Sequence, residues 1–172
     1  MLKPFSYTLI IIDMQPGFMA SHKSTLNENI MREIKIAKKN KQGILILEYD
    51  RKLSGRTHKE ILNQIRNYPF KVVVEKLNCD GCEEVLEQFK EHPLFLNKNH
   101  IKICGVNTDE CVNDTTVSLY EQLYKNTKIE VLADCCNTHM DSRPKDDDPF
   151  DWIEAFCSNG KNPVKLIGNP LK

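Results

Sequence analysis

The sequence predicts a three-layer α/β fold, in which a mostly parallel sheet of six strands carries helices on both faces. Two observations lead to this prediction. Short runs that are apolar along their whole length alternate with longer segments whose apolar residues recur every three to four positions. Fully apolar strands joined by helical crossovers are typical of parallel sheets that are covered on both faces.

The first half of the chain supplies three strands and two helices. The strands are short and rich in isoleucine, leucine and valine, whereas the helical segments place apolar residues on one face. Thr57 precedes the second helical segment and is its expected N-cap. The strands are expected at residues 7–13, 43–49 and 70–76, and the helices at residues 27–40 and 57–68.

The second half repeats the alternation. The acidic run Asp146–Asp148, followed by Pro149, is a favourable helix start because of the helix dipole and the fixed φ of proline. A metal-binding role for the same run is the alternative. The helices are expected at residues 83–90, 111–126 and 146–157, and the strands at residues 100–106, 128–136 and 163–168.

Composition narrows the function classes. The 172 residues are expected to form one domain, residues 1–172, and 40% hydrophobic with 28% charged residues is typical of a globular protein. The 24 basic and 24 acidic residues cancel, which argues against a nucleic-acid partner. No apolar run is long enough for a bilayer, and the N-terminus lacks a cleavage site, so neither a membrane partner nor export is expected. Seven cysteines, an odd number, favour reduced thiols in the cytoplasm.

The positions just after the strands are the places to look for chemistry, because ligands bind beyond the carboxyl ends of parallel strands. Asp13 ends the first strand, Lys76 ends the third, and Cys111 begins the helix after the fourth. A nearby cation and a helix N-terminus lower the pKa of a thiol, and a carboxylate can accept its proton. The grouping therefore predicts a nucleophilic site.

Each of these residues also has an ordinary structural role. Cysteine packs well in cores, aspartate caps turns, and lysine at a strand end is commonly solvated. Asp109 and Glu110 precede Cys111 and disfavour a thiolate. Either Lys76 outweighs them, or the proton moves to Asp13 only when substrate is attacked. The coincidence of all three residues at equivalent strand ends favours the functional reading.

Four motifs resemble a known family. They are "LIIIDMQPGF" at residues 9–18, Lys76 closing "VVVEK", "CGVNTDECVNDTTVSLYEQ" at residues 104–122 and "VLADCC" at residues 131–136. Together they resemble the isochorismatase-like cysteine hydrolases, a superfamily that also holds nicotinamidases and N-carbamoyl amidases. The resemblance implies a Rossmann-like isochorismatase fold and a catalytic triad of Asp13, Lys76 and Cys111.

The resemblance also implies details of the turn before Cys111. It implies a non-proline cis peptide between Val106 and Asn107, and an oxyanion hole made by the backbone N–H groups of Asn107 and Cys111. Phe18, in the first motif, becomes a candidate for the substrate pocket. Members of the superfamily are commonly dimers or larger, so a homo-oligomer is expected.

The chain departs from the nicotinamidase pattern at two places. Nicotinamidases carry an Asp-x-His metal cluster after the second strand, whereas here Asp50 has no histidine two residues on and His58 stands by itself. We therefore expect no metal, no cofactor, and a substrate other than nicotinamide. Beyond Lys76 the usual "S-A-F" segment is replaced by "LNCDGCEEV", which gives a different pocket wall.

Two features leave alternatives open. Cys79 and Cys82 form a C-x-x-C, which is either a zinc or redox motif or a turn around Gly81 that brings one of the two thiols to the substrate. A zinc site needs four ligands, and no suitable second pair is present, so the turn is favoured. Asp114, three residues past Cys111, is either a contact for a substrate amine or a solvated helix carboxylate.

The sequence thus predicts a hydrolase that acts on a small-molecule amide or related C–N bond other than a peptide bond, through a thioester on Cys111. An isochorismatase-type vinyl-ether hydrolase is the first alternative, although that reaction does not need a thiol nucleophile. A non-catalytic binding or interaction protein that keeps the fold is the second.

Overall fold

The sheet is the centre of the molecule. The computed structural model describes residues 3–123, 127–139, 148–154 and 164–171. Within them six strands pair in the order β3-β2-β1-β4-β5-β6, and all five pairings are parallel. The strands are β1 (Thr8–Ile12), β2 (Gly43–Tyr49), β3 (Lys71–Lys76), β4 (His100–Val106), β5 (Lys128–Asn137) and β6 (Val164–Ile167).

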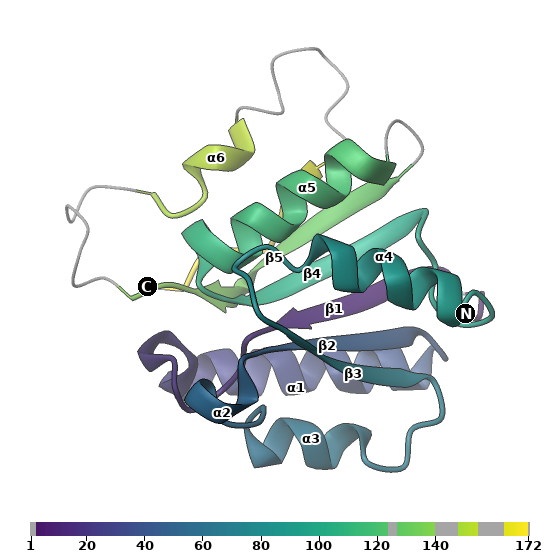
Figure 1. The fold of residues 1–172 in the computed structure, drawn as a ribbon, viewed down its shortest axis with the longest axis horizontal. Helices are drawn as coiled ribbons and strands as arrows, with labels where there is room; N and C mark the ends of the chain where they lie inside the picture. Colours follow the sequence, from purple (N-terminus) through teal and green to yellow (C-terminus); the bar gives the residue numbers. More distant parts are fainter. Residues whose placement is uncertain (1–2, 124–126, 140–147, 155–163, 172) are drawn as a thin grey trace.

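Helices cover both faces of this sheet, which confirms the predicted three-layer α/β architecture (Figure 1). The first helices, α1 and α3, pack together on one face, and α4 packs with α5 on the other. The helical elements are η1 (Met19–His22), α1 (Ser24–Lys39), α2 (Arg51–Ser54), α3 (Lys59–Ile65), α4 (Cys82–Glu91), η2 (Thr108–Val112), α5 (Asn113–Leu123) and α6 (Asp151–Glu154).

The element boundaries differ from the predicted ones mainly at short helices. The turns η1 and α2 were not predicted, because four residues carry too little periodicity to identify. The N-cap of α3 is His58 and not the predicted Thr57. The N–H of Thr57 instead donates to the Glu48 carboxylate at 2.8 Å. Of the helix predicted at residues 146–157, residues 146–147 and 155–157 lie outside the described part of the chain.

The core forms where the strands face the helices. All five residues of β1 are buried, and α1 buries the stripe Leu26, Ile30, Ile34 and Ala37 against the sheet. Each such Ile or Leu contributes about 1.5–3 kcal/mol when its side chain leaves water. The isoleucine-rich strands and the helical stripe therefore fix the relative position of the layers.

The strand order changes direction between β1 and β4, which makes this the switch point of the sheet. Gly105 lies here with a φ of 129°, and a Cβ on it would sit 2.0 Å from the Ile12 carbonyl oxygen. Only glycine permits this approach of β4 to β1. In such sheets ligands bind beyond the carboxyl ends of the strands beside the switch point.

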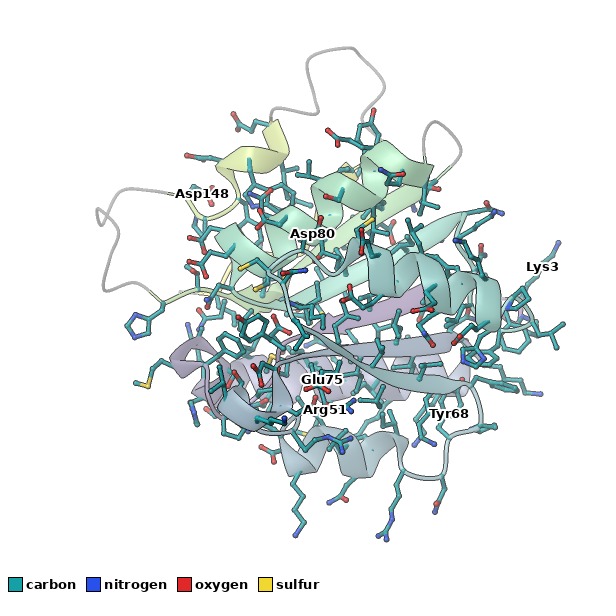
Figure 2. All side chains as sticks on the ribbon, in the orientation of Figure 1. Lys3, Arg51, Tyr68, Glu75, Asp80 and Asp148 are labelled. Atoms are coloured by element: carbon teal, nitrogen blue, oxygen red, sulfur yellow. The ribbon has the colours of Figure 1, made fainter. Side chains whose placement is uncertain are left out.

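Labelled side chains in Figure 2 mark the two edges of the sheet, at the amino ends and at the carboxyl ends of the strands. Lys3 and Tyr68 lie near the amino ends of the strands, at the right of Figure 2, whereas Arg51 and Asp80 lie nearer the carboxyl ends. In the part of the chain that the structure describes, no helix has the length and apolar character needed to cross a membrane.

Candidate active site

Three residues predicted from the sequence meet at the carboxyl edge of the sheet. The Lys76 Nζ lies 2.9 Å from Asp13 Oδ2, and both side chains are completely buried. The Cys111 side chain is 3% exposed, and its thiol interacts with the same carboxylate. The carboxylate thus lies between an ammonium and a thiol, away from bulk water.

Asp13 reaches this position because the chain turns sharply after β1. Its φ is 53°, a left-handed conformation that aspartate tolerates better than most residues. Its N–H still donates to the Leu47 carbonyl at 3.0 Å, and its own carbonyl accepts from the Gln15 N–H at 2.7 Å. These bonds hold the carboxylate at the switch point.

The Lys76 ammonium has a full set of partners despite its burial. Besides Asp13, it donates to the carbonyls of Asn78 at 2.8 Å and Cys79 at 2.9 Å. The ammonium thus makes two hydrogen bonds to carbonyls and one ion pair with a carboxylate. It also lies over the Tyr49 ring, 5.1 Å from the centroid. A buried charge is tolerated when it is paired and hydrogen-bonded in this way.

Burial sets the proton distribution between Asp13 and Cys111. It raises the pKa of Asp13, and the Lys76 ammonium only partly opposes that rise. Burial also raises the pKa of Cys111, with the Asp13 charge adding to the rise and Lys76 opposing it. The resting site therefore holds a neutral thiol beside a basic carboxylate.

The Lys76 cation lowers the Cys111 pKa as expected, but burial and the Asp13 charge outweigh it, so the net direction is upward. The Asp13 charge, which the sequence analysis did not count against a thiolate, adds to the rise in the Cys111 pKa. Asp109 instead accepts a hydrogen bond from Thr138, and Glu110 accepts one from the Asn107 side chain at 2.8 Å. A thiol with a raised pKa is compatible with the other reading, in which the proton moves to Asp13 during attack, and that reading stays a prediction.

The turn that presents Cys111 is irregular. The Val106–Asn107 peptide bond is cis, and the following turn, η2, is π-helical. The N–H groups of Glu110 and Val112 both donate to the Asn107 carbonyl, at 3.3 and 3.0 Å. The N–H of Cys111, between them in sequence, takes no part in these two bonds. Three buried side-chain oxygens around the turn lack a hydrogen-bond partner among the described residues: Asn107 Oδ1, Thr108 Oγ1 and Asn113 Oδ1.

The C-x-x-C segment borders the site as a turn. Gly81 is the N-cap of α4, where a Cβ would lie 2.6 Å from a Leu47 methyl and 3.0 Å from the Lys76 side chain. Cys79 is exposed, and its carbonyl binds the Lys76 ammonium, whereas Cys82 is buried at the start of α4. Burial raises the pKa of Cys82 to about 12.

An aromatic pair lies on the other side of Lys76. The rings of Phe18 and Tyr49 approach edge to face, with centroids 6.1 Å apart. Phe18 immediately precedes η1, and Tyr49 ends β2. Phe18 thus joins the site through Tyr49, a residue that the sequence analysis did not identify. Asp114 is exposed at the start of α5, and burial and the charges of Asp80 and Glu110 raise its pKa.

The residues at the nicotinamidase metal position do not fit a metal. Asp50 uses Oδ1 to cap α2, accepting from the N–H groups of Lys52 and Leu53 at 3.0 and 3.2 Å. Lys52 stands where a histidine ligand is needed, and His58 Nε2 lies 2.7 Å from Ser21 Oγ. Across the described ranges no group of three or more His, Cys, Asp or Glu side chains is arranged to hold a metal ion.

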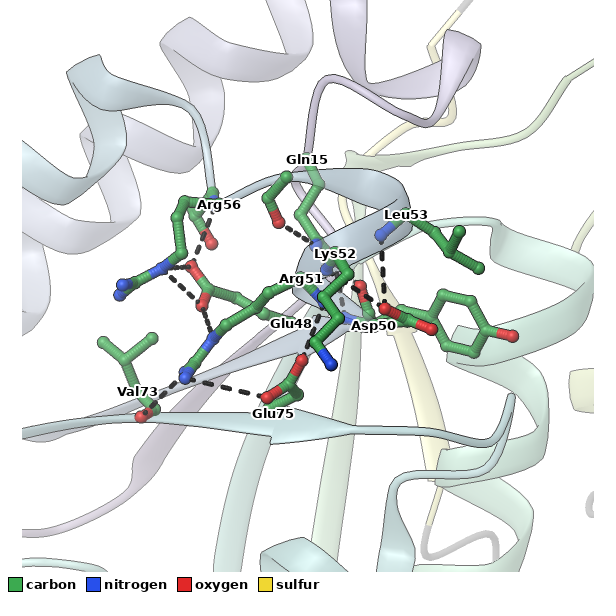
Figure 3. A network of polar contacts seen from close by, with 12 residues as sticks. Gln15, Glu48, Asp50, Arg51, Lys52, Leu53, Arg56, Val73 and Glu75 are labelled. Atoms are coloured by element: carbon green, nitrogen blue, oxygen red, sulfur yellow. Dashed lines mark hydrogen bonds and ion pairs between the residues drawn. The ribbon is translucent and has the colours of Figure 1, made fainter.

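A buried carboxylate holds the loop that follows β2 (Figure 3). Glu48 is completely buried and accepts from Arg51 Nε at 2.6 Å, Arg56 Nε at 2.9 Å and the Thr57 N–H at 2.8 Å. Burial raises the pKa of Glu48, but these hydrogen bonds together bring it below its usual value. An acidic residue inside the apolar run "GILILEY" was the available signal for this network.

Gln15 links the ends of β1 and β2. Its Oε1 accepts from the Tyr49 N–H at 2.6 Å, and its Nε2 donates to the Tyr49 carbonyl at 2.8 Å. Gln15 is completely buried. Its place in the quoted motif "LIIIDMQPGF" could have identified it, but its partner could not be read from the sequence.

Comparisons with known proteins agree with this fold. A sequence model of the Isochorismatase domain matches residues 7–146, whereas no curated protein matches the chain. A nicotinamidase from Staphylococcus aureus has 19% identity and a TM-score of 0.69, over 95% of this chain and 99% of that one. A nicotinamidase from Bacillus subtilis has 12% identity and a TM-score of 0.71, over 95% and 100%.

A third structure is an Escherichia coli hydrolase described as octameric and of unknown specificity. It has 18% identity and a TM-score of 0.60, over 79% of this chain and 69% of that one. At such identities the likeness to all three structures is one of fold.

Proposed function

The chain belongs to the isochorismatase family of hydrolases, and on that premise we propose that it cleaves a small-molecule amide or related C–N bond other than a peptide bond. The observation that carries the proposal is the buried contact of Cys111 and Lys76 with the Asp13 carboxylate. A nucleophile, a base and a fixed positive charge then lie within reach of one substrate carbonyl.

In the first step, Asp13 accepts the Cys111 proton while the sulfur attacks the carbonyl carbon. The raised pKa of Asp13 favours this transfer, because a more basic carboxylate accepts a proton more readily. The Lys76 ammonium stabilises the negative charge that Asp13 and Cys111 share during the transfer. The backbone N–H groups of Asn107 and Cys111 bind the oxyanion, and each such donor is typically worth about 3 kcal/mol in the transition state.

In the second step, the protonated Asp13 returns the proton to the leaving nitrogen. Ammonia or an amine departs, and the acyl group stays on Cys111 as a thioester. Asp13 then takes a proton from a water molecule that attacks the thioester carbonyl. The acid is released as the Cys111 sulfur leaves, and Asp13 returns the proton taken from water to that sulfur, which restores the resting thiol and carboxylate.

The substrate-binding part of the proposal rests on fewer contacts. Phe18 reaches Lys76 through the Tyr49 ring, the Cys79 carbonyl accepts from Lys76, and Cys82 is buried at the start of α4. The buried unpaired oxygens of Asn107 and Asn113 are available to a polar substrate. Asp50 and His58 serve other partners, so nicotinamide held through a metal is not proposed for this chain.

A screen of small amides and ureides for ammonia release tests the proposal, with mass spectrometry to detect an acyl adduct on Cys111. The Cys111→Ala variant should lose turnover and the adduct. Cys104→Ala is the matched control, because that thiol is buried in β4 and contacts the Ile10 carbonyl instead of the site. Full turnover by Cys111→Ala would sink the proposal, and turnover of a vinyl ether by that variant would favour the isochorismatase-type alternative.

We also propose that residues 1–172 form a single domain that assembles as a homo-oligomer in the cytoplasm and acts without a metal or other cofactor. The octameric Escherichia coli hydrolase supports the oligomer by its shared fold only. Light scattering of the purified chain measures the assembly, and a monomeric mass would contradict it.

A further inference from the structure

We propose that Tyr49 is a positioning residue of this site, whose ring holds the Lys76 ammonium against Asp13. The inference rests on the proposed function, because Lys76 has a role in turnover only if Cys111 and Asp13 carry the reaction. Tyr49 would act through Lys76 and would not itself touch the reacting atoms.

The sheet register places the two side chains together. Tyr49 and Lys76 are paired residues at the carboxyl ends of the parallel strands β2 and β3. The pairing continues one step beyond the strands, where the Asp50 N–H donates to the Lys76 carbonyl at 2.9 Å. The Tyr49 ring and the Lys76 side chain therefore lie on the same side of the sheet at a fixed height.

Gln15 keeps Tyr49 in strand conformation after its neighbour β1 has ended. The last paired residue of β1 is Ile12, opposite Leu47, and only the Asp13 N–H extends that ladder. The carboxamide of Gln15 then supplies one acceptor and one donor to the Tyr49 backbone, at 2.6 and 2.8 Å. A side chain thus takes over the hydrogen bonding of the missing strand.

The ring completes the surroundings of a buried cation. Two carbonyls accept hydrogen bonds from Lys76, Asp13 forms an ion pair with it, and the Tyr49 ring centroid lies 5.1 Å from its Nζ. An aromatic face attracts a cation within about 6 Å, and the attraction is larger where water is excluded. Lys76 is completely buried, so the attraction between the ring and the ammonium acts where water is excluded.

A purely structural role and a substrate-wall role are the alternatives. Tyr49 also meets Phe18 edge to face, so its ring could serve as part of the pocket wall. A wall residue changes KM, whereas a residue that acts through Lys76 changes the reactivity of Cys111 even without substrate. The test therefore measures Cys111 directly.

The experiment measures the rate at which iodoacetamide labels Cys111 in the full chain at pH 8, by mass spectrometry of the Cys111 peptide. Tyr49→Phe keeps the ring and should leave the rate within about twofold. Tyr49→Leu removes the aromatic face and should lower the rate about tenfold. The same two variants are then made in the K76M background, which keeps side-chain length but removes the charge.

The proposal expects Tyr49→Leu to have no further effect in the K76M background, because the two residues act as one unit. An equal loss in both backgrounds, or an unchanged rate in Tyr49→Leu, overturns it. Should Tyr49→Leu fail to fold by thermal melting, Tyr49→Met gives the same comparison. The proposed function fails separately, through full turnover by Cys111→Ala.

Discussion

The edge of the sheet at the amino ends of the strands and the edge at their carboxyl ends bury different groups. At the amino edge, a cavity of about 550 Å³ lies between α4, the end of α5 and the loop before β4. Its ionisable lining residues, Lys90 and Lys98, are both exposed. At the carboxyl edge, Asp13 and Lys76 are completely buried and in contact. This hollow therefore lies away from the candidate chemistry.

In the proposed site the chemistry lies with buried ionisable groups and not with the hollow at the amino edge. An apolar hollow forms wherever helices and a loop diverge over a sheet, at little cost. Burying a charge costs several kcal/mol unless partners compensate it, so paired buried charges beside a thiol need an explanation. Perturbed ionisable groups gather at functional sites for this reason.

The largest expected difference between the edges is in turnover. Asp13→Asn removes the proposed base while keeping the side-chain shape, so kcat should fall by about 10²- to 10⁴-fold. Lys98→Met, at the amino edge, is the matched control and should change kcat less than about twofold. The measurement is ammonia release from the substrate found in the amide screen. Equal losses in the two variants would remove the distinction between the edges.

The next difference is in stability. Lys76→Met leaves the buried Asp13 without its cation, which should lower the free energy of unfolding by about 3–5 kcal/mol. The same substitution at the exposed Lys90 should change it by no more than about 0.5 kcal/mol. Urea titrations of both variants give the values. A Lys76→Met variant as stable as the parent chain would mean that the buried pair contributes nothing.

A smaller effect is expected at Glu48, which supports the carboxyl edge. Glu48→Gln loses charge-assisted hydrogen bonds from Arg51 and Arg56, and the free energy of unfolding should fall by about 1–3 kcal/mol at pH 7. The folded pKa of Glu48 lies below its usual value, so its stabilisation is present above the unfolded pKa and is lost as pH falls through the folded pKa. Melting curves from pH 7 to pH 3 should therefore converge for the two proteins. A difference in melting temperature between the two proteins that stays constant from pH 7 to pH 3 would contradict the lowered pKa of Glu48.

The smallest expected effect is a displacement of the pH profile. Burial raises the pKa of Asp13, so its protonation should abolish kcat/KM with a midpoint above about 3.9, the usual value for aspartate. The midpoint is read from the acid limb of kcat/KM against pH. A midpoint at or below the usual value would mean that Lys76 outweighs burial.

The fold could be predicted because the strands are fully apolar. Strand β2 has the predicted bounds, and the alternation of strands with helices was enough to predict a parallel sheet. Topology alone also places Asp13, Lys76 and Cys111 at one edge, which is why three residues far apart in sequence could be grouped.

Other features depend on tertiary contacts that no local pattern carries. The N-cap of α3 shifts to His58 because Glu48 binds the preceding N–H. The position of Tyr49 depends on strand register and on Gln15. The direction of the Cys111 pKa depends on burial, which outweighs the nearby cation and could not be weighed from residue types.

The resting protonation of Cys111 has a consequence for survival under oxidative stress. Peroxides react with thiolates, so a thiol that loses its proton only during attack on substrate is a poor target between turnovers. Cys79, close by and exposed, is the more accessible sulfur. The proposed nucleophile should therefore be oxidised only slowly, while the exposed thiol of Cys79 is consumed first.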